Sequence, residues 1–427
     1  MSREREREFE VVRDPLWDNI RLDGAALAVL DTPAVQRLRY VRQLGHAFLV
    51  YPGATHSRFE HALGAYHLAR RALAILDERG ELDGIDPDDL VAVPLAALLH
   101  DIGHYPFSHA LEEAGFPGHE ALGAARLETP PLSTVLDELG GPGLVRRIGE
   151  LIQGRSGSPL QGLISGTLDL DKIDYLSRDA RMCGVPYGVL DVDRLLASIT
   201  LVEGPGGLEI GIHEKGASAM ESLLFAKYQM YRNVYWHHAV RSATCMFKRA
   251  VREAVAAGSV STAELPELTD DAFMQRLIGE GRNTMAAAVR SRRLFKRALD
   301  LPASDVPKSA GWVVEDAGLL ARVEDQVARE VGLEPGELLI DFPARENLLS
   351  VDLRLRLRGG GVEHLTDAGL TGQLGLPRIA DQLYQSARRL RVFVARPADR
   401  SLDGLANLVG VPGPEVEDRL RAGLLLT

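Results

Sequence analysis

The sequence predicts a mostly α-helical protein with a smaller α+β lobe in its C-terminal part. Two observations lead to this fold class. Apolar residues recur at helical spacing through most of residues 15–300, and residues 351–357 alternate apolar with charged side chains. The 427 residues are 45% hydrophobic, which is enough to bury a sizeable core. We therefore expect a charged N-terminal segment over residues 1–14, a helical domain over residues 15–300 and an α+β lobe over residues 301–427.

Amphipathic helices account for the helical domain. Apolar residues recur every three or four positions from Phe59 to Leu76, which predicts a helix there. Residues 88–100 form a second, more apolar helix, in which Pro94 indicates a kink or a late start. Helical spacing also fits three later segments: 167–182, 216–256 and 284–300.

Strands are predicted in the C-terminal part. In residues 351–357 every second residue is valine or leucine, and the residues between them are aspartate or arginine, which is a strand pattern. Residues 338–340 and 392–394 are short apolar runs that fit partner strands. Three glycines at 359–361 indicate a turn.

The composition narrows the class of protein. Two cysteines, Cys183 and Cys245, are too few for a disulfide framework and indicate a reducing compartment. The N-terminus alternates Arg and Glu without a signal-peptide stretch, and no apolar run approaches the roughly 20 residues that span a bilayer. We therefore expect a cytoplasmic protein with no membrane segment. A net charge of −11 disfavours nucleic-acid binding through the overall field, although local basic patches leave that partner open.

Histidines concentrate in one stretch of the sequence. Eight of the 12 lie between His46 and His119, and an apolar helix ends there in His100 and Asp101. Adjacent imidazole and carboxylate groups at a helix end can reach one ion, because the last turn splays side chains that otherwise point about 100° apart. This donor pair suits Fe, Mn, Zn or Ni better than an all-oxygen site would.

Two further ligands are predicted on other helices. One is His61, on the helix that precedes His100. The other is Asp171, which shares a helical face with Tyr175 and Arg178 by spacings of four and seven. A carboxylate, an aromatic ring and a cation on one face suit a metal ion beside a phosphorylated, ring-bearing ligand.

Four residues match the H…HD…D signature of the HD superfamily of metal-dependent phosphohydrolases: His61, His100, Asp101 and Asp171. The surrounding sequence resembles, more specifically, the HD-domain dNTP triphosphohydrolases of vertebrates and bacteria. The similar stretches extend over about residues 10–300 and are densest at four places: residues 31–45, 51–61, 100–109 and 171–179.

The resemblance implies a metal-dependent enzyme. The four matching residues would hold a divalent transition metal ion (Mn, Fe, Zn, Ni or Co), with or without Mg. Two imidazoles and two carboxylates leave positions for water and a phosphate oxygen, and the ion would lower the pKa of that water. The family's reaction is attack of this water on the α-phosphorus of a deoxynucleoside triphosphate, which releases the deoxynucleoside and inorganic triphosphate.

Four residues match family positions around the reacting phosphate and the leaving group: His104, His109, Glu112 and His119. His119 matches the catalytic histidine, and Glu112 stands where relatives have its aspartate partner. The longer side chain of Glu112 still allows pairing. His104 and His109 match residues that face the phosphates and the leaving oxygen, and His109 could share or take over proton donation.

Eight residues match substrate contacts of the family: Gln43, Leu44, Arg58, Lys172, Tyr175, Asp179, Lys227 and Tyr235. Arg58 and Lys172 would bind phosphates. Tyr175 would pack on the sugar and leave no room for a 2′-hydroxyl, while Gln43 and Asp179 would bind the 3′-hydroxyl. Lys227 and Tyr235 would lie beside the base.

Five residues match nucleotide-activation sites at the family's oligomer interface: Asp31, Gln36, Arg39, Arg194 and Lys215. Three positions depart from the family pattern, since Glu10 replaces a lysine, His213 an arginine and Ala219 an asparagine. A carboxylate repels a triphosphate, so activation competes with altered activating ligands and with constitutive activity. Asp31 could also simply cap a helix. The resemblance further implies a homo-oligomer, either a tetramer or a hexamer.

Two other functions stay open at this point. An HD enzyme could act on another phosphoester, such as a signalling nucleotide or single-stranded nucleic-acid ends. A nucleotide-sensing or nucleic-acid-binding module could keep the ligand set as a relic. The basic run over residues 290–297 fits a solvated or subunit-contacting helix face better than a nucleic-acid site.

Overall fold

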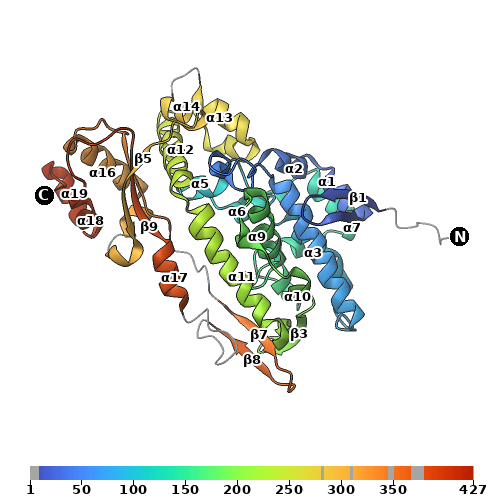
Figure 1. The fold of residues 1–427 in the computed structure, drawn as a ribbon. Helices are drawn as coiled ribbons and strands as arrows, with labels where there is room; N and C mark the ends of the chain where they lie inside the picture. The colour runs from blue at the N-terminus through green and yellow to red at the C-terminus, as the bar shows by residue number, and fades with distance from the viewer. Residues whose placement is uncertain (1–8, 280–282, 308–310, 345–350, 367–378, 427) are drawn as a thin grey trace.

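The computed structural model describes residues 9–279, 283–307, 311–344, 351–366 and 379–426. Within these residues the fold is mostly α-helical, as the sequence predicts, and it has three small sheets. A large helical body carries the N-terminal side of the chain, and a smaller lobe with α-helices and strands lies beside it (Figure 1). Among the described helices, none is at once long enough and apolar enough to cross a bilayer.

A hairpin and a stack of helices form the helical body. β1 (Glu10–Asp14) pairs antiparallel with β2 (Asp18–Leu22). The helices that follow are α1 (Gly24–Leu30), α2 (Pro33–Gln36), α3 (Arg58–Glu78), α4 (Pro87–Leu99), α5 (Ser108–Glu112), α6 (His119–Leu127), α7 (Leu132–Gly140), α8 (Gly143–Ile152), α9 (Leu170–Cys183), α10 (Val192–Leu196), α11 (Ala217–Met230), α12 (His238–Ala256), α13 (Asp270–Ile278) and α14 (Thr284–Arg290).

Local sequence signals explain where the central helices begin and end. α3 begins with a capping box, in which the Ser57 backbone N–H donates to Glu60 Oε2 at 2.6 Å. α9 begins after Asp169, whose side chain accepts a hydrogen bond from the Lys172 backbone N–H at 3.0 Å. It ends at Gly184, which adopts the left-handed conformation with φ +68°.

Helix α4 is more deeply buried than the other long helices, which explains its apolar sequence. It runs unbroken from Pro87 to Leu99 through Pro94, so that proline does not delay its start. α3 packs against both α4 and α9. These three helices therefore form the centre of the helical body.

A four-stranded sheet joins distant parts of the chain. β3 (Ile199–Gly204) and β4 (Gly207–His213) form a hairpin, and β4 pairs in parallel with β7 (Leu353–Arg356). β7 pairs antiparallel with β8 (Val362–Leu365), and α17 (Ala380–Ala387) then packs against α11 (Figure 1). Leu353, Leu355 and Leu365 belong to the core of the helical body. The described residues between 353 and 387 thus extend this body, although the sequence analysis assigns them to the lobe.

The C-terminal lobe surrounds an antiparallel sheet in the order β5-β9-β6. Its elements are β5 (Lys296–Pro302), α15 (Trp312–Glu315), α16 (Ala317–Glu330), β6 (Leu338–Asp341), β9 (Arg389–Val394), α18 (Gly404–Val409) and α19 (Gly413–Ala422). A separate apolar core fills it, with side chains such as Val323, Leu338 and Val392 fully buried. The lobe is therefore built from two chain segments rather than one.

Two predicted helices differ from those in the structure. The helix predicted over 284–300 ends at Arg290, Arg292 has a positive φ of +57°, and strand β5 begins at Lys296. The chain changes to a strand there because Leu299 and Leu301 pack on the core of the lobe. The basic run at 290–297 is consequently not a helix face. The helix predicted over 216–256 is interrupted between α11 and α12 by a π-helical turn, Tyr231–Tyr235.

The predicted partner strands also pair differently. The runs at 338–340 and 392–394 pair with each other, with Ile340 opposite Val392. The alternating strand, in contrast, lies in the sheet of the helical body. Sequence alternation identified the strands but not which of them pair.

Candidate metal centre and active site

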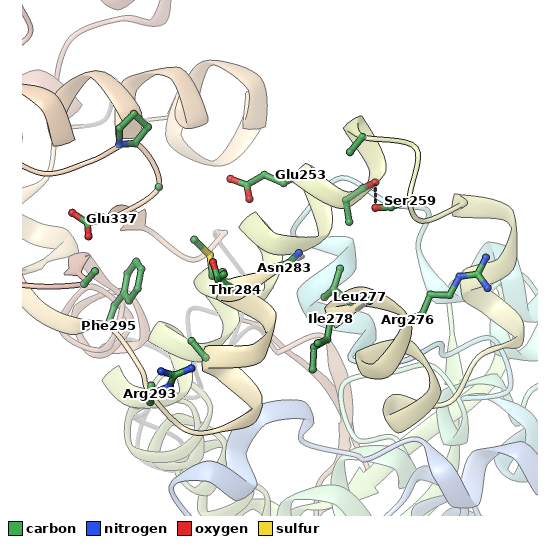
Figure 2. A pocket seen from close by; sticks show the side chains of 18 of the residues that line it. Glu253, Ser259, Arg276, Leu277, Ile278, Asn283, Thr284, Arg293, Phe295 and Glu337 are labelled. Carbon is green, nitrogen blue, oxygen red and sulfur yellow. Dashed lines mark hydrogen bonds between the residues drawn. The ribbon is translucent and has the colours of Figure 1, made fainter. Parts of the chain in front are cut away.

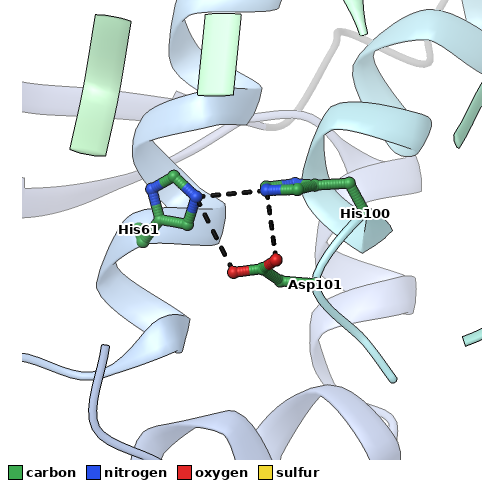
Figure 3. Close-up of side chains that lie close together, drawn as sticks. All are labelled: His61, His100 and Asp101. Carbon is green, nitrogen blue, oxygen red and sulfur yellow. Dashed lines mark hydrogen bonds and ion pairs between the residues drawn. The ribbon is translucent and has the colours of Figure 1, made fainter. Parts of the chain in front are cut away.

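Three helices bring the four predicted metal ligands together. His61 lies in the first turn of α3, and Asp171 lies in the first turn of α9. His100 and Asp101 directly follow the last residue of α4. Figure 3 shows His61 on its helix facing the consecutive residues His100 and Asp101.

The donor atoms lie at the separations that a shared ion requires. His61 Nε2 is 3.1 Å from His100 Nε2, 3.0 Å from Asp171 Oδ1 and 3.8 Å from Asp101 Oδ2. His100 Nε2 is 3.4 Å from Asp101 Oδ1 and 3.5 Å from Asp171 Oδ1. Bonds of about 2.0–2.2 Å to an ion place neighbouring donors roughly 3 Å apart in an octahedral site and roughly 3.5 Å apart in a tetrahedral one. His61, His100 and Asp101 could therefore hold one divalent ion, and Asp171 Oδ1 lies within 3.5 Å of both imidazoles.

The hydrogen bonds of the two imidazoles test this fit independently. His61 Nδ1 donates to Asp174 Oδ2 at 2.7 Å, and His100 Nδ1 donates to the Ala97 carbonyl at 2.8 Å. In the neutral rings the lone pairs are then on the Nε2 atoms, which face each other at 3.1 Å. Two lone pairs at this distance repel unless a proton or a metal ion lies between them. The residues present thus fit a metal ion.

Asp174, which the sequence analysis did not single out, contacts a predicted metal ligand. Its buried carboxylate accepts hydrogen bonds from His61, from Arg178 Nε at 2.9 Å and from Trp17 Nε1 at 2.5 Å. Arg178, which was expected on the ligand face, is buried and also pairs with Asp14 at 2.8 Å. The signal that could have revealed Asp174 is a second carboxylate one helical turn after a ligand of the same helix.

The electrostatics of the cluster favour a positive charge. Burial alone would lower the pKa of His61, but hydrogen bonds to Asp171 and Asp174 outweigh it and raise this pKa to about 10. Burial would likewise raise the pKa of Asp101, but Arg58 and neighbouring histidines hold it well below its usual range. The site therefore keeps its carboxylates ionised and stabilises a cation between them.

Arg58 and His104 contact a metal ligand. Arg58 Nη1 donates to Asp101 Oδ2 at 2.6 Å, and its side chain is 3% exposed. Its Nε is buried without a hydrogen-bond partner among the described residues. His104 Nε2 lies 3.1 Å from Asp101 Oδ1. Both side chains therefore orient Asp101, and the phosphate contact predicted for Arg58 would have to use the nitrogen atoms that Asp101 leaves free.

The predicted proton-transfer residues form a second cluster beside the first. Glu112 Oε1 accepts hydrogen bonds from His119 Nδ1 at 2.8 Å and from the His119 backbone N–H at 3.1 Å. Glu112 Oε2 accepts a hydrogen bond from His109 Nδ1 at 3.2 Å. Burial would raise the pKa of Glu112, but these two histidines hold it well below its usual range. The ring of His104 stacks on that of His119 with centroids 3.8 Å apart, which connects the two clusters.

Asp179, Tyr235 and Gln43 meet around one histidine. Asp179 Oδ1 accepts a hydrogen bond from His56 Nε2 at 2.8 Å, and Oδ2 accepts one from the Tyr235 hydroxyl at 2.7 Å. The Gln43 backbone N–H donates to the His56 carbonyl at 3.0 Å. Gln43 Oε1 is buried and has no hydrogen-bond partner among the described residues. His56, absent from the predicted site, thus links three residues of it.

The remaining predicted substrate residues lie on α9, α11 and the segment before α3. The Lys172 ammonium pairs with the Asp169 carboxylate and donates to the Gly166 carbonyl at 2.9 Å. Tyr175 and Leu44 are half-buried against the core of the helical body. Lys227 is half-buried on α11. In this conformation Lys172 is therefore already paired with Asp169, the residue that caps the N-terminus of its own helix.

The five residues predicted for nucleotide activation fall into two groups. Gln36 Oε1 accepts a hydrogen bond from Arg39 Nε at 2.8 Å, and Asp31 lies exposed after α1. Arg194 Nε donates to the Lys215 carbonyl at 3.1 Å, and both residues are exposed. The structure thus brings Arg194 and Lys215 side by side.

A cavity of about 1110 Å³ lies between α12, α13, α14 and a loop of the C-terminal lobe (Figure 2). Leu277 and Phe295 contribute apolar surface, and Glu253, Arg293 and Glu337 contribute charges. None of the predicted site residues is among those that line it. The predicted chemistry therefore does not use this cavity.

Two family descriptions match the chain. Residues 58–179 match the HD domain, and residues 190–370 match the HD associated region. The first match begins at the start of α3 and ends in α9, and so contains all four predicted metal ligands.

Similar proteins are found among curated sequences and solved structures. The uncharacterized protein MJ1154 of Methanocaldococcus jannaschii is 36% identical over 71% of this chain and 63% of its own. The deoxynucleoside triphosphate triphosphohydrolase SAMHD1 of Bos taurus is 29% identical over 67% of this chain and 58% of its own. The chain therefore spans about three fifths of these relatives. The crystal structure of a phosphohydrolase from Bacteroides thetaiotaomicron has the same fold, with a TM-score of 0.71, 22% identity and coverage of 91% of this chain and 100% of that one.

Proposed function

Because the chain belongs to the HD superfamily, we propose that it is a metal-dependent enzyme that hydrolyses deoxynucleoside triphosphates to deoxynucleoside and inorganic triphosphate. The observation that supports this proposal best is the convergence of four donor side chains from three helices beside the paired His119 and Glu112. A structural metal site would not require a second cluster of titratable groups next to it.

The chain's own residues define the roles in the proposed reaction. A divalent ion bound by the four ligands would lower the pKa of a bound water and polarise a phosphate oxygen. Asp174 fixes the tautomer of His61, and Arg58 fixes the orientation of Asp101. These contacts keep the ligand atoms in place before substrate arrives.

His119 is suited to give a proton to the leaving 5′-oxygen. Its Nδ1–H is held by Glu112, which leaves Nε2 to carry the transferred proton. His109 also contacts Glu112 and is 65% exposed, so it can share this role or pass protons to solvent. The stacked ring of His104 keeps His119 next to the metal ligands.

Three observations favour a deoxynucleotide over other phosphoesters. Asp179 is oriented by two hydrogen bonds, and Gln43 has a buried oxygen available, so both can serve a 3′-hydroxyl. Tyr175 lies one helical turn after the ligand Asp171, where its ring can cover a sugar. SAMHD1 of Bos taurus, which this chain resembles, is named for deoxynucleoside triphosphate hydrolysis.

The deciding experiment screens four dNTPs and four NTPs against the purified protein with Mn, Fe, Mg and Co, and measures nucleoside and triphosphate directly. We expect equal amounts of deoxynucleoside and triphosphate from dNTPs, and no product from Asp101→Ala. Release of orthophosphate or of a mononucleotide would instead assign the chain to another phosphohydrolase reaction. Unchanged phosphate release by Asp101→Ala would contradict a catalytic role for the metal site.

Nucleotide activation is tested separately with pure dATP, with and without GTP. The adjacent Arg194 and Lys215 support a second phosphate-binding site, whereas Glu10 in β1 carries the wrong charge for one. Light scattering of the same samples would show whether a tetramer or hexamer forms. Identical rates and identical masses with and without GTP would remove activation by this nucleotide.

A further inference from the structure

Helix α5, which carries His109 and Glu112, is too short to hold its own position. It spans five residues, whereas isolated helices below about 12–15 residues are marginally stable in water. At its N-terminal side Phe107 has a positive φ of +52°, which is strained for a residue with a side chain. The Phe107 backbone N–H donates to Asp270 Oδ1 at 3.3 Å, which fixes this end of the helix. Its other end needs an anchor as well.

Glu113, directly after α5, supplies the second anchor. Its two carboxylate oxygens accept hydrogen bonds from Arg241 Nη1 at 2.8 Å and from Arg241 Nη2 at 2.7 Å. Lys248 Nζ donates to the same carboxylate at 2.9 Å. Burial would raise the pKa of Glu113, but these two cations on α12 hold it below its usual range. A bidentate pair of this kind fixes direction as well as distance.

Arg241 is held in turn by the C-terminal lobe. Its Nε donates to Asp341 Oδ2 at 3.0 Å, and its Nη2 donates to Asp341 Oδ1 at 2.6 Å. The side chains of Arg241 and Asp341 are only 5% and 1% exposed. Asp341 is the last residue of β6 and lies opposite Arg391 of β9. Contacts therefore continue from the sheet of the lobe through Arg241 to Glu113, the neighbour of Glu112.

From these contacts we propose that Asp341 and Arg241 are positioning residues for the Glu112–His119 pair, so that strand β6 of the lobe sets the geometry of proton transfer. The inference rests on the proposed role of His119. The alternative is that the Asp341–Arg241 contact only docks the lobe on α12.

Helix α12 offers a matched control for this alternative. Arg249, eight residues after Arg241, also binds a carboxylate of the lobe, with Nη2 2.8 Å and 3.0 Å from the oxygens of Asp325. Each arginine keeps another carboxylate when the lobe residue is neutralised, Glu113 for the first and Glu253 for the second. Among the described residues Arg249 forms no hydrogen bond or ion pair with α5, so Asp325→Asn weakens docking of the lobe without touching Glu113.

The experiment compares Asp341→Asn with Asp325→Asn in the full chain, with and without His119→Ala, using dATP or the substrate that the screen identifies. We expect Asp341→Asn to lower kcat about ten- to hundredfold, because small misplacements of a catalytic group are costly. KM, metal content and thermal midpoint should match those of Asp325→Asn. In the His119→Ala background the loss caused by Asp341→Asn should disappear, because the pair through which it acts is already gone.

Three results would overturn the inference. Equal kcat values for the two asparagine variants would leave Asp341 a docking residue. An undiminished loss in the His119→Ala background would show that Asp341 acts by another route. Full activity of His119→Ala itself would refute the proposed role of His119 and the inference that rests on it, whereas the hydrolysis of deoxynucleoside triphosphates would stand on the products that the screen detects. If Asp341→Asn does not fold, Glu113→Gln replaces it, because Glu113 is the more exposed carboxylate partner of Arg241. We expect the same loss of kcat from Glu113→Gln, and the same disappearance of this loss in the His119→Ala background.

Discussion

The hydrogen-bond acceptors behind the two ligand imidazoles differ in charge. His61 donates to the carboxylate of Asp174, whereas His100 donates to the neutral carbonyl of Ala97. Burial would raise the pKa of Asp174, but Arg178 and His61 lower it to about 2. An ionised acceptor increases the basicity of the opposite ring nitrogen, so His61 should be the stronger of the two nitrogen ligands.

Asp174→Asn should therefore weaken metal binding without removing a ligand. We expect the affinity for Mn²⁺ to fall about 10- to 100-fold, because the charged acceptor behind His61 becomes a neutral amide. Calorimetric titration of the metal-free full chain measures this change. Asp193→Asn, which removes an exposed carboxylate paired with Arg71 at 2.6 Å, is the control. Equal affinities for Asp174→Asn and the unaltered protein would contradict this role.

Glu324 gives the stability of the lobe a defined pH dependence. Burial raises its pKa from 4.5 to about 7 in the folded chain. Between these values the folded carboxyl keeps a proton that the unfolded chain has released, so stability falls as pH rises from about 4.5 to about 7. Glu324→Gln should remove this loss and gain on the order of 3 kcal/mol at pH 7.5 relative to pH 4.5. Urea unfolding at both pH values measures the difference, and parallel pH curves would contradict it.

Residues of the candidate site were easier to single out from the sequence than the contacts that their side chains make in the fold. The ligands follow a motif spacing that leaves few structural alternatives. The role of Asp174, in contrast, depends on how closely α9 approaches α3, which local sequence does not encode. Arg58 and Lys172 were predicted to meet phosphates, yet here they pair with Asp101 and Asp169. The sequence shows that an arginine or a lysine is present, but not which carboxylate its side chain pairs with in the folded protein.

At the level of elements, the close approach of α3 and α9 depends on Gly64. This residue lies one turn after His61, and a Cβ there would collide with Asp174 Oδ1 and come within 2.5 Å of Arg178 Nη2. The contact between helices that holds His61 therefore has no room for a larger residue.

Gly64→Ala should separate these helices at the metal site. We expect a loss of stability of about 1–3 kcal/mol from overpacking, together with loss of the rise in thermal midpoint on adding Mn²⁺. Gly143→Ala, where a Cβ would meet nothing within 4 Å at the start of α8, is the matched control. A normal response of Gly64→Ala to Mn²⁺ would show that α3 and α9 can adjust without cost to the site.

Helices with local start and stop signals were predictable as elements, whereas the pairing of strands with distant partners was not, and β5 was missed. The capping box at Ser57 and Glu60 and the apolar spacing that follows define α3. β5 was mistaken for helix because residues 292–297 hold four basic residues and carry no alternation. Its conformation is fixed by pairing with β9, almost a hundred residues later. No local pattern contains that information.

On the scale of the whole molecule, the metal site joins three helices that are distant in sequence. An ion that binds only the folded chain stabilises it by about 2.7 kcal/mol at a hundred times its dissociation constant. Treatment with EDTA should thus lower the thermal midpoint, and Mn²⁺ should restore it. The thermal midpoint of Asp101→Ala should not respond to either. A midpoint that is the same with EDTA and with Mn²⁺ would argue against the ligand set.

The fold class was predictable because periodicity distinguishes helices from strands over long stretches. The division of the chain was harder, because residues 353–365 return to the helical body after the lobe has begun. Such a return depends on the pairing of β4 with β7, which joins residues more than a hundred positions apart. The closeness of the four predicted ligands was more accessible to prediction than this division, since they follow a fixed motif.

Strand β7 covers an edge of β4 that the β3–β4 hairpin leaves open. A chain clipped after residue 300 would lose that cover and expose the backbone N–H and C=O groups of Gly211–His213. Unpaired edges of this kind are templates for association between molecules. Shortening at this point should therefore yield aggregates, visible by light scattering, and not a free-standing catalytic half.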